Sequence, residues 1–472
     1  MRFFFLHAID NGVLIWYNNK IFYVNVIYCE CLVNMKFTVQ NVGKIEHAVL
    51  QLNGITVVVG DNNAGKTTIS RALYAFINSL CNIDAEVVGQ RTHEITRLIR
   101  SFYSAFRRPF GFADRELRVA IERFVQNDNG QDDGFAIRQY LMMRFGSAVA
   151  EDEINRCIEQ LVEIRNLPNK SVRQQIIENY FDSVFRGQCV SLRNGVDCGQ
   201  ITAVVDNHSI DMYLRKAQTT YTSDINVQRK AYFVESPDLL GNWGLYRPWR
   251  ASSLSGSIRK AIDEKLSVGV DRPADSAFED LLFAEKYSRF AEEVSDITDG
   301  HFAFDENQVL RFSEVDRTSG KSNSYDLNNV SEGVKSFGVL ELLLRYRILR
   351  EKDVLILDEP EVHLHPEWQL KYAHLIVEIQ KAFNLRVLIT THSPNFMLAI
   401  KYYSKLAGTN DIVNSYRVKQ SEGDVRFSVI SAEDPLDWDD AYVAFLKSSE
   451  LMWRLQSQAM GNMDLAETQN GY

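Results

Sequence analysis

Cysteine is scarce in this sequence, with six residues among 472, and no two of them form a CxxC pair. Structural zinc sites are built from closely spaced cysteine and histidine ligands, so we do not expect a zinc site here. The scattered thiols are typical of a reducing compartment, which predicts a cytoplasmic protein. The six positions are Cys29, Cys31, Cys81, Cys157, Cys189 and Cys198.

Long apolar runs and an excess of positive charge are also lacking. No stretch reaches the roughly 18 consecutive apolar residues of a membrane-spanning helix, so we expect no membrane partner. The formal net charge is −10 and the isoelectric point is about 5.5, which argues against a protein coated in nucleic acid. A local basic groove is still compatible with this charge, because partners bind to patches rather than to a total.

The first 34 residues are aromatic and apolar, but polar residues such as His7, Asp10 and Lys20 interrupt them. They lack the small-residue cleavage site of a signal peptide. From Met35 onward the sequence KFTVQNVGKIEHAVLQL is typical of the start of a nucleotide-binding domain. We therefore expect Met35 to be the natural start and residues 1–34 to be an extension that is not native. The alternative is an additional hairpin at the edge of a sheet.

The rest of the chain predicts an α/β fold that a block of helices interrupts. Helices and strands alternate in the C-terminal part, with a helix over 334–349, a strand over 354–357, a helix over 368–383, a strand over 386–390 and a helix over 395–402. This alternation predicts a parallel sheet covered by helices. Helical spacing over 91–185, with a break near Pro168, precedes antiparallel-like strands. We assign 35–90 to a first lobe, 91–186 to a helical insertion and 187–472 to the remainder of the domain.

Residues 60–68, GDNNAGKTT, fit the phosphate-binding pattern GxxxxGK[ST] (Walker A), between an apolar strand and a helix-compatible run. The glycines let backbone N–H groups face the phosphates, Lys66 supplies positive charge, and the Thr67 hydroxyl is a candidate Mg²⁺ ligand. The helix N-terminus adds its dipole to this anion site. The motif predicts ATP and Mg²⁺ as cofactors. Its predicted binding residues are Gly60, Asp61, Asn62, Asn63, Ala64, Gly65, Lys66, Thr67 and Thr68.

Two adjacent carboxylates end the apolar strand of VLILDEPEVHLHP (Walker B). Asp358 is placed to bind Mg²⁺ directly or through water, and Glu359 to orient and deprotonate the attacking water. Phosphoryl transfer needs charge neutralisation and an aligned nucleophile, so adjacent carboxylates with different tasks are expected. A solvated acidic turn is the alternative interpretation.

Histidines follow both of the predicted strands. His392, at the tip of VLITTHSP, is placed to contact the γ-phosphate and is assigned with Lys66 and Glu359 to the catalytic group. His363 and His365 could form a metal site with Glu361, but packing at a dimer interface is the interpretation that we prefer.

Together, GDNNAGKT, VSEGVKS (330–336), LILDEPEVHLHP and ITTHSP resemble the ABC-type ATPases of the RecF, SMC and OLD group, most of all stand-alone bacterial "AAA family ATPase" members. The resemblance implies an ABC-type P-loop ATPase head, with a mixed or parallel sheet, an antiparallel β lobe and a helical insertion. It also implies that Ser331 and Gly333, with Lys335 nearby, complete the partner subunit's site in a head-to-tail homodimer or higher oligomer. Glu332 and Val334 depart from transporter signatures, and Gln228 is a weak candidate for the glutamine-loop residue.

A basic and aromatic stretch, 91–124, lies in the helical insertion. Its arginines and aromatic residues suit phosphate contacts and base stacking, which would make nucleic acid a partner. A solvated helix face with an apolar stripe is the alternative. The residues are Arg97, Arg100, Arg107, Arg108, Arg115, Arg118, Arg123, Phe102, Tyr103, Phe106 and Phe110.

These features predict an ATP-hydrolysing enzyme that dimerises on ATP. The resemblance suggests that it gates a separate effector or nuclease in bacterial antiphage defence. Two alternatives stay open, a DNA-repair ATPase of the RecF kind and a scaffold locked by ATP with little turnover.

Overall fold

The computed structural model describes residues 35–430 apart from short gaps, together with the backbone of four strands that precede Met35. The gaps are residues 109–114, 127–133, 206–207, 216–217, 223–225, 236–239, 241–257, 264–265, 267–276, 308, 316–320 and 421–427. The chain divides into a smaller unit, residues 1–29, 79–181 and 218–228, and a larger unit, residues 30–78, 182–217 and 229–472.

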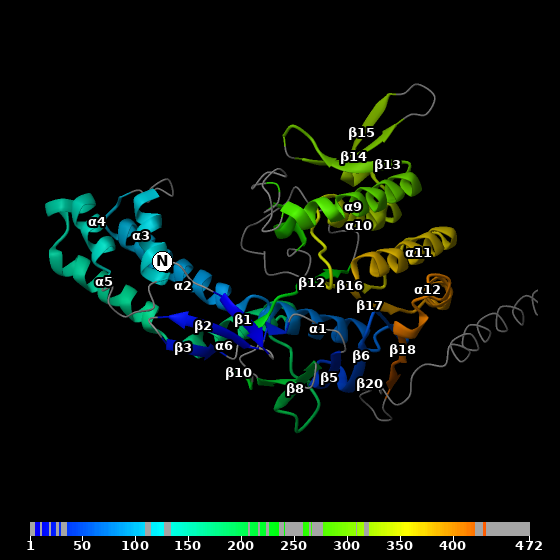
Figure 1. Ribbon diagram of the computed structural model, residues 1–472, viewed down its shortest axis with the longest axis horizontal. Coiled ribbons are helices and arrows are strands. Elements are labelled where there is room, and N and C mark those ends of the chain that lie inside the picture. The colour runs from blue at the N-terminus through cyan, green and yellow to red at the C-terminus, as the bar shows by residue number, and fades with distance from the viewer. Residues whose placement is uncertain are drawn as a thin grey trace, which may run out of the picture. The chain divides into compact units, whose positions relative to one another are not determined.

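A five-stranded parallel sheet forms the centre of the larger unit (Figure 1). Its strands β16 and β17 are buried along their whole length, which explains why they are continuous apolar runs rather than alternating patterns. The strands in spatial order are β12 (Ala231–Val234), β16 (Val354–Asp358), β17 (Arg386–Thr391), β7 (Ile55–Val59) and β18 (Val413–Arg417).

Helices with well-defined starts cover this sheet. Helix α11 starts with His365 as N-cap and a proline at its first turn, and α12 starts with Ser393, whose hydroxyl accepts a hydrogen bond from the Phe396 amide. Helices α11 and α12 run side by side, as do α9 and α10 (Figure 1). The helices are α1 (Lys66–Leu80), α9 (Ala277–Thr298), α10 (Glu332–Arg345), α11 (Pro366–Phe383) and α12 (Pro394–Leu406).

Two antiparallel arrangements flank the parallel sheet. In the first, β9, β8, β5 and β6 are neighbours, and β8 alternates strictly between buried and half-buried residues, as a strand with one covered face does. The second is the three-stranded sheet β13–β14–β15, which α10 contacts through β13. The bounds are β5 (Met35–Val42), β6 (Ile45–Leu52), β8 (Cys198–Val205), β9 (His208–Arg215), β13 (Gly300–Phe304), β14 (Leu310–Val315) and β15 (Ser322–Asp326).

Short strands complete this larger unit. Strand β20 (Ser428–Ile430) pairs in parallel with β6, and β19 (Lys419–Gln420) pairs with β20. The predicted mixed α/β fold, with one parallel sheet and antiparallel sheets, is therefore confirmed.

Helices make up most of the smaller unit. Helix α5 ends at Asn166 and α6 begins at Asn169, so the expected break falls at Pro168. The core of α2 to α5 is apolar, with Ile95, Ile99 and Leu161 fully buried. The helices are α2 (Ile83–Ala105), α3 (Arg115–Gln126), α4 (Phe135–Phe145), α5 (Glu151–Asn166) and α6 (Asn169–Phe185).

The residues before Met35 form strands in the same unit. Strands β1 (Phe5–Ile9), β2 (Gly12–Tyr17) and β3 (Lys20–Val24) make an antiparallel sheet of their own, rather than a hairpin at the edge of a larger sheet. Strand β4 (Tyr28–Cys29) pairs with β11 (Asn226–Val227). Within the described part of the chain, no helix combines the length and the apolar character that crossing a bilayer requires.

Candidate functional site

The phosphate-binding loop joins β7 to α1 at the carboxyl end of the parallel sheet. Gly65 has φ +84° and Asn63 has φ +64°, so the loop depends on backbone conformations that side chains rarely adopt. Gly60 lies so close to Val418 that an added Cβ would be 2.9 Å from it. The sequence therefore forms a tight loop whose last residues open helix α1, where backbone N–H groups are available to an anion.

Lys66 is the buried cation of this loop, with 3% of its surface exposed. Its Nζ donates to the carbonyls of Gly60 at 2.9 Å and Asp61 at 3.0 Å, and lies 3.1 Å from Glu359 Oε1. An ammonium group with these partners remains close to the position that a bound phosphate would take.

Thr67 and Asp358 meet directly. The Thr67 hydroxyl donates to Asp358 Oδ2 at 2.7 Å, and the Thr390 hydroxyl of the neighbouring strand donates to Asp358 Oδ1. Burial raises the pKa of Asp358 above its ordinary value, while the hydrogen bonds from Thr390 and Thr67 lower it. A hydroxyl and a carboxylate are the hard oxygen ligands that Mg²⁺ prefers, so Thr67 and Asp358 fit the cation.

Glu359 follows directly in a left-handed conformation, φ +51°. A non-glycine residue at such a φ costs about 1–3 kcal/mol, and such strain gathers at functional sites. The Glu359 amide donates to the Thr390 carbonyl at 2.8 Å, which fixes the turn, and the side chain is shared between Lys66 and His392. The turn thus separates the directions of two neighbouring carboxylates, Asp358 toward Thr67 and Glu359 toward Lys66.

His392 lies at the end of β17, with its Nδ1 3.4 Å from Glu359 Oε2 and 3.4 Å from Glu361 Oε1. The structure therefore brings together Lys66, Thr67, Asp358, Glu359 and His392, all of which the sequence analysis named.

Thr67, Asp358 and Glu359 line a solvent-open pocket with about 370 Å³ of free volume, within the usual size range of small-molecule sites. Asn62 and Asn63 of the loop contribute to one wall, and Ser336 of α10 and Tyr372 of α11 to another. Glu235, the residue after β12, also lines it.

Sequence reasoning missed Glu235 as a site residue. Because β12 runs parallel to β16, its carboxyl end lies at the edge of the sheet where Asp358 lies, and Glu235 follows that end. Glu235 raises the pKa of Asp358 through charge repulsion, after the larger effect of burial, and it lies 2.5 Å from Arg71 on α1. Gln228, the weak glutamine-loop candidate, precedes the amino end of the same strand, and its role stays a prediction. The pairing of β12 with β16 was the information needed to place Glu235 in the site, and no local sequence pattern supplies it.

Ser331, Gly333 and Lys335 do not line this pocket, although Ser336 of the same signature segment does. Ser331 is exposed and caps α10, its hydroxyl 3.4 Å from the Val334 amide. Gly333 is buried against the His363 carbonyl and Trp368, and Lys335 is buried with its Nζ 2.7 Å from Glu332. Of these three residues, Ser331 is the one that presents its side chain to solvent. Gly333, two residues further on, packs against the loop that follows Glu359.

The two histidines of that loop have separate positions. His363 is exposed, has φ +71° and lines the pocket. His365 accepts a hydrogen bond from the Glu367 amide at 3.4 Å as the cap of α11. Glu361 is buried and points to Thr391 and His392, so these three residues do not converge on one point.

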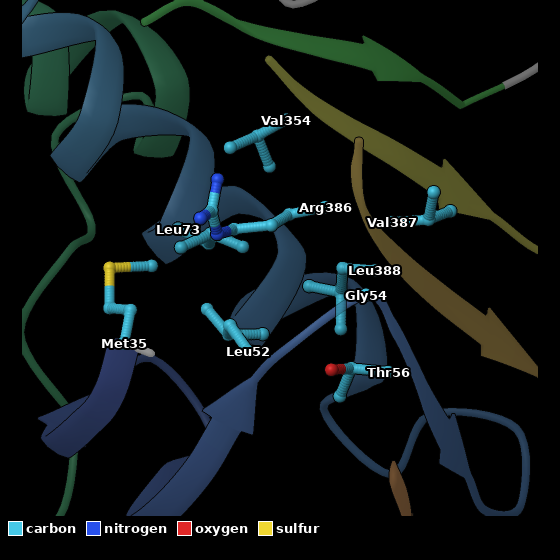
Figure 2. Close-up of a pocket in the computed structure, with 9 residues that line it drawn as sticks. All are labelled: Met35, Leu52, Gly54, Thr56, Leu73, Val354, Arg386, Val387 and Leu388. Carbon is cyan, nitrogen blue, oxygen red and sulfur yellow. The ribbon is translucent and has the colours of Figure 1, made fainter. Parts of the chain in front are cut away.

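A second cavity lies at the opposite edge of the parallel sheet (Figure 2). It is bounded mainly by apolar side chains such as Met35, Leu52 and Leu73, where strands β7, β16 and β17 begin. It has no room for a water molecule, so it is a packing gap rather than a ligand site.

The basic and aromatic stretch is mainly a helix face with an apolar stripe. Tyr103 is buried, and Phe102, Tyr103 and Phe106 all pack against Phe145, so these rings contribute to the helical core. The seven arginines are exposed, while Phe110 lies outside the described residues.

Two family models match separate stretches of the chain. The first, "AAA ATPase domain", matches residues 35–139, and the second, "AAA domain, putative AbiEii toxin, Type IV TA system", matches residues 222–399. They include the phosphate-binding loop and the carboxylate strand respectively. No curated protein matches the chain.

Among solved structures, an SMC head domain from Thermotoga maritima is 11% identical, with 86% of this chain and 99% of that one covered and a TM-score of 0.36. An SmcHead bound to the C-winged helix domain of ScpA is 11% identical over 86% and 99%, with a TM-score of 0.40. A Smc head with an extended coiled coil, bound to the C-terminal domain of ScpA derived from Pyrococcus furiosus, is 10% identical over 88% and 99%, with a TM-score of 0.39. At these scores we base the functional argument on the site itself.

Proposed function

We propose that this chain, whose sequence matches AAA-type ATPase domains at 35–139 and 222–399, binds ATP with Mg²⁺ and hydrolyses it. One observation carries the proposal: the Lys66 ammonium, the Thr67 hydroxyl and the carboxylates of Asp358 and Glu359 converge at one edge of the parallel sheet. Phosphoryl transfer requires these four functions together.

Each residue then has a distinct task. The loop amides and Lys66 bind the phosphates, and Thr67 with Asp358 holds the cation. Mg²⁺ would supply charge neutralisation on the phosphate oxygens. Glu359 orients the attacking water and takes its proton, and His392 contacts the γ-phosphate.

The ion pair between Lys66 and Glu359 connects binding to catalysis. Lys66 Nζ lies 3.1 Å from Oε1 of Glu359, the proposed base. Phosphates that bind to Lys66 compete with Glu359 for the same ammonium, which frees the carboxylate for water. Activation of the base is thereby tied to occupancy of the loop.

For the assembly, we propose an ATP-dependent head-to-tail homodimer in which Ser331 completes the partner's site, and a cytoplasmic role in gating a separate effector or nuclease in antiphage defence. The exposure of Ser331 at the start of α10 supports the first part. The description of the matched domain as a putative toxin of a type IV toxin–antitoxin system is in keeping with the second.

Replacement of Lys66 tests the central claim. Lys66→Ala should lower ATP affinity or turnover at least about 100-fold, because the β- and γ-phosphates lose their buried counter-charge. The matched control is Lys371→Ala, which removes an exposed lysine from α11. Calorimetry with a non-hydrolysable analogue and a phosphate-release assay measure both quantities. Wild-type turnover in Lys66→Ala, or no ATP binding by the wild type, would refute the proposal.

A further inference from the structure

Glu361 is a buried carboxyl group to which the reaction described above gives no task. It lies in the loop between β16 and α11, and only 4% of its surface is exposed. One carboxylate oxygen, Oε1, accepts hydrogen bonds from the Thr391 hydroxyl at 2.6 Å and from the His392 amide at 3.2 Å. The carboxylate strand is thereby joined to the tip of the next strand at His392.

The other oxygen of Glu361 lacks such partners. Oε2 is buried, and no group among the described residues forms a hydrogen bond with it. An unsatisfied buried acceptor destabilises the folded chain, so a glutamate here is a poor choice for stability alone. Burial raises the pKa of Glu361, and the bonds from Thr391 and His392 lower it again. The contacts of the other oxygen, Oε1, with Thr391 and His392 therefore explain the position of Glu361 better than stability does.

The imidazole ring of His392 also lies near Oε1 of Glu361. Its Nδ1 lies 3.4 Å from Glu361 Oε1 and equally 3.4 Å from Glu359 Oε2. Glu359 is shared with Lys66, and in the proposed reaction it turns to the attacking water. Glu361 is fixed by Thr391 and by backbone, so it can hold Nδ1 when Glu359 leaves.

We propose that Glu361 is a positioning residue that holds the His392 ring through Nδ1 and so directs Nε2 toward the γ-phosphate. A carboxylate beside Nδ1 keeps a proton on that nitrogen and fixes the ring orientation, so that in the doubly protonated ring Nε2–H is aimed to donate to a γ-phosphate oxygen. This inference rests on the proposed ATPase function, because it deepens the role of a residue of that same site.

The test replaces the anion by an amide of the same shape. In Glu361→Gln the carbonyl can still accept from Thr391, but the charge that faces Nδ1 is lost. ATP affinity should remain within about twofold, whereas the single-turnover rate should fall about 10- to 100-fold, the range for a carboxylate that orients a histidine. Glu367→Gln, in the exposed first turn of α11, is the matched control and should leave both quantities unchanged.

A spectroscopic readout separates positioning from general damage. Nitrogen-15 spectra of the histidine side chains, with His392→Gln used for assignment, should show a proton on Nδ1 of His392 in the wild type. Glu361→Gln should move that proton population toward Nε2. In a double-mutant cycle, Glu361→Gln should change little once His392 is replaced, because the two residues act as one unit.

The outcomes are distinct for the two proposals. An unchanged His392 spectrum in Glu361→Gln, or additive losses in the cycle, would overturn the positioning role. If the wild type hydrolyses no ATP, the proposed function fails, and the His392 spectrum alone decides whether Glu361 holds the ring. Should Glu361→Gln misfold, Thr391→Val removes the hydroxyl that fixes Glu361, and an unchanged spectrum there would also count against the proposal.

Discussion

Glu359 combines an unusual backbone conformation with a side chain that contacts two other residues of the candidate site. It lies at φ +51°, directly after a buried strand, and its carboxylate is shared by a lysine and a histidine. Its neighbour Asp358 is held by two threonine hydroxyls and cannot exchange roles with it. The turn between them therefore gives the two adjacent carboxylates different neighbours, as the different tasks proposed for them require.

Glu359→Gln should separate binding from turnover. The amide keeps the size of the side chain but cannot take a proton, and it no longer competes with phosphates for Lys66. We expect ATP affinity to be equal or higher and turnover to fall at least about 100-fold, with an ATP-bound dimer that persists in light scattering. Glu351→Gln, an exposed glutamate at the far end of β16, serves as control. Wild-type turnover in Glu359→Gln would show that another group is the base.

At the residue scale, the sequence predicted those site residues that belong to a recognisable contiguous motif. Lys66 and Thr67 belong to a contiguous loop, and Asp358 and Glu359 to the end of an apolar run. Glu235 and the partners of Glu361 depend on which strands pair and in which register, as Ile356 with Leu388 or Phe233 with Ile356. A single sequence contains no local signal for such pairing, so these contacts needed the structure.

At the scale of elements, helix α10 is the clearest example of sequence and packing in agreement. Ser331 caps its start, and its buried side chains form a broad apolar surface. At Gly338 an added Cβ would be 2.4 Å from the ring of Phe302, so the helix needs glycine to approach β13. The sequence predicted the helix itself, but not this close contact, because residues 302 and 338 are brought together by the tertiary fold.

Glu341 joins the same two elements and makes their contact dependent on pH. It is fully buried, contacts the Phe302 amide at 3.2 Å, and accepts from Arg345 Nε at 3.0 Å. Burial raises the pKa of Glu341 to about 7, although Arg345 and Phe302 act in the opposite direction. In the unfolded chain the same group titrates near about 4.3.

The sign of the effect follows from proton binding. Between about pH 4 and 7 the folded chain retains a proton that the unfolded chain releases, so the free energy of unfolding falls as pH rises through this window. The loss of unfolding free energy from this group should total about 3–4 kcal/mol and should not grow further above about pH 8. Glu341→Gln should remove this part of the pH dependence in urea unfolding, while the exposed Glu306→Gln should not. Equal pH dependence in Glu341→Gln and the wild type would contradict the prediction, as would a protection factor of the Phe302 amide that does not change with pH.

At the scale of the whole molecule, the candidate site is assembled from segments far apart in the chain. Strand β7 near the start pairs with both β17 and β18 near the end, and this pairing places the phosphate-binding loop one strand away from the carboxylate strand β16, with β17 between them. Alternating helices and strands allowed the parallel sheet to be predicted, but the neighbours of β7 could not be. Ser331, Gly333 and Lys335 of the signature segment, in contrast, do not line the pocket at this edge of the sheet.

Ser331→Arg tests whether those signature residues act on a second copy of the chain. Lys66 and Thr67 would still bind nucleotide in their own protomer, so affinity should change less than about twofold. A bulky cation at the exposed start of α10 would obstruct the approach of the partner's γ-phosphate, and ATP-driven dimerisation and turnover should fall at least about tenfold. Ser322→Arg, which adds the same charge to an exposed position on β15, should leave both unchanged.

Mixing Ser331→Arg with Lys66→Ala protomers then distinguishes a shared site from a self-contained one. In a head-to-tail heterodimer, one composite site combines both defects, while the other combines an intact Lys66 with an intact Ser331. Partial turnover should therefore return, in proportion to the heterodimers isolated with two affinity tags. If Ser331 acted on its own chain, each protomer would keep its own defect and mixing would restore nothing. Each heterodimer contains one site in which an intact phosphate-binding loop faces an intact Ser331. Verified heterodimers without any recovery of turnover would therefore exclude composite sites that act independently.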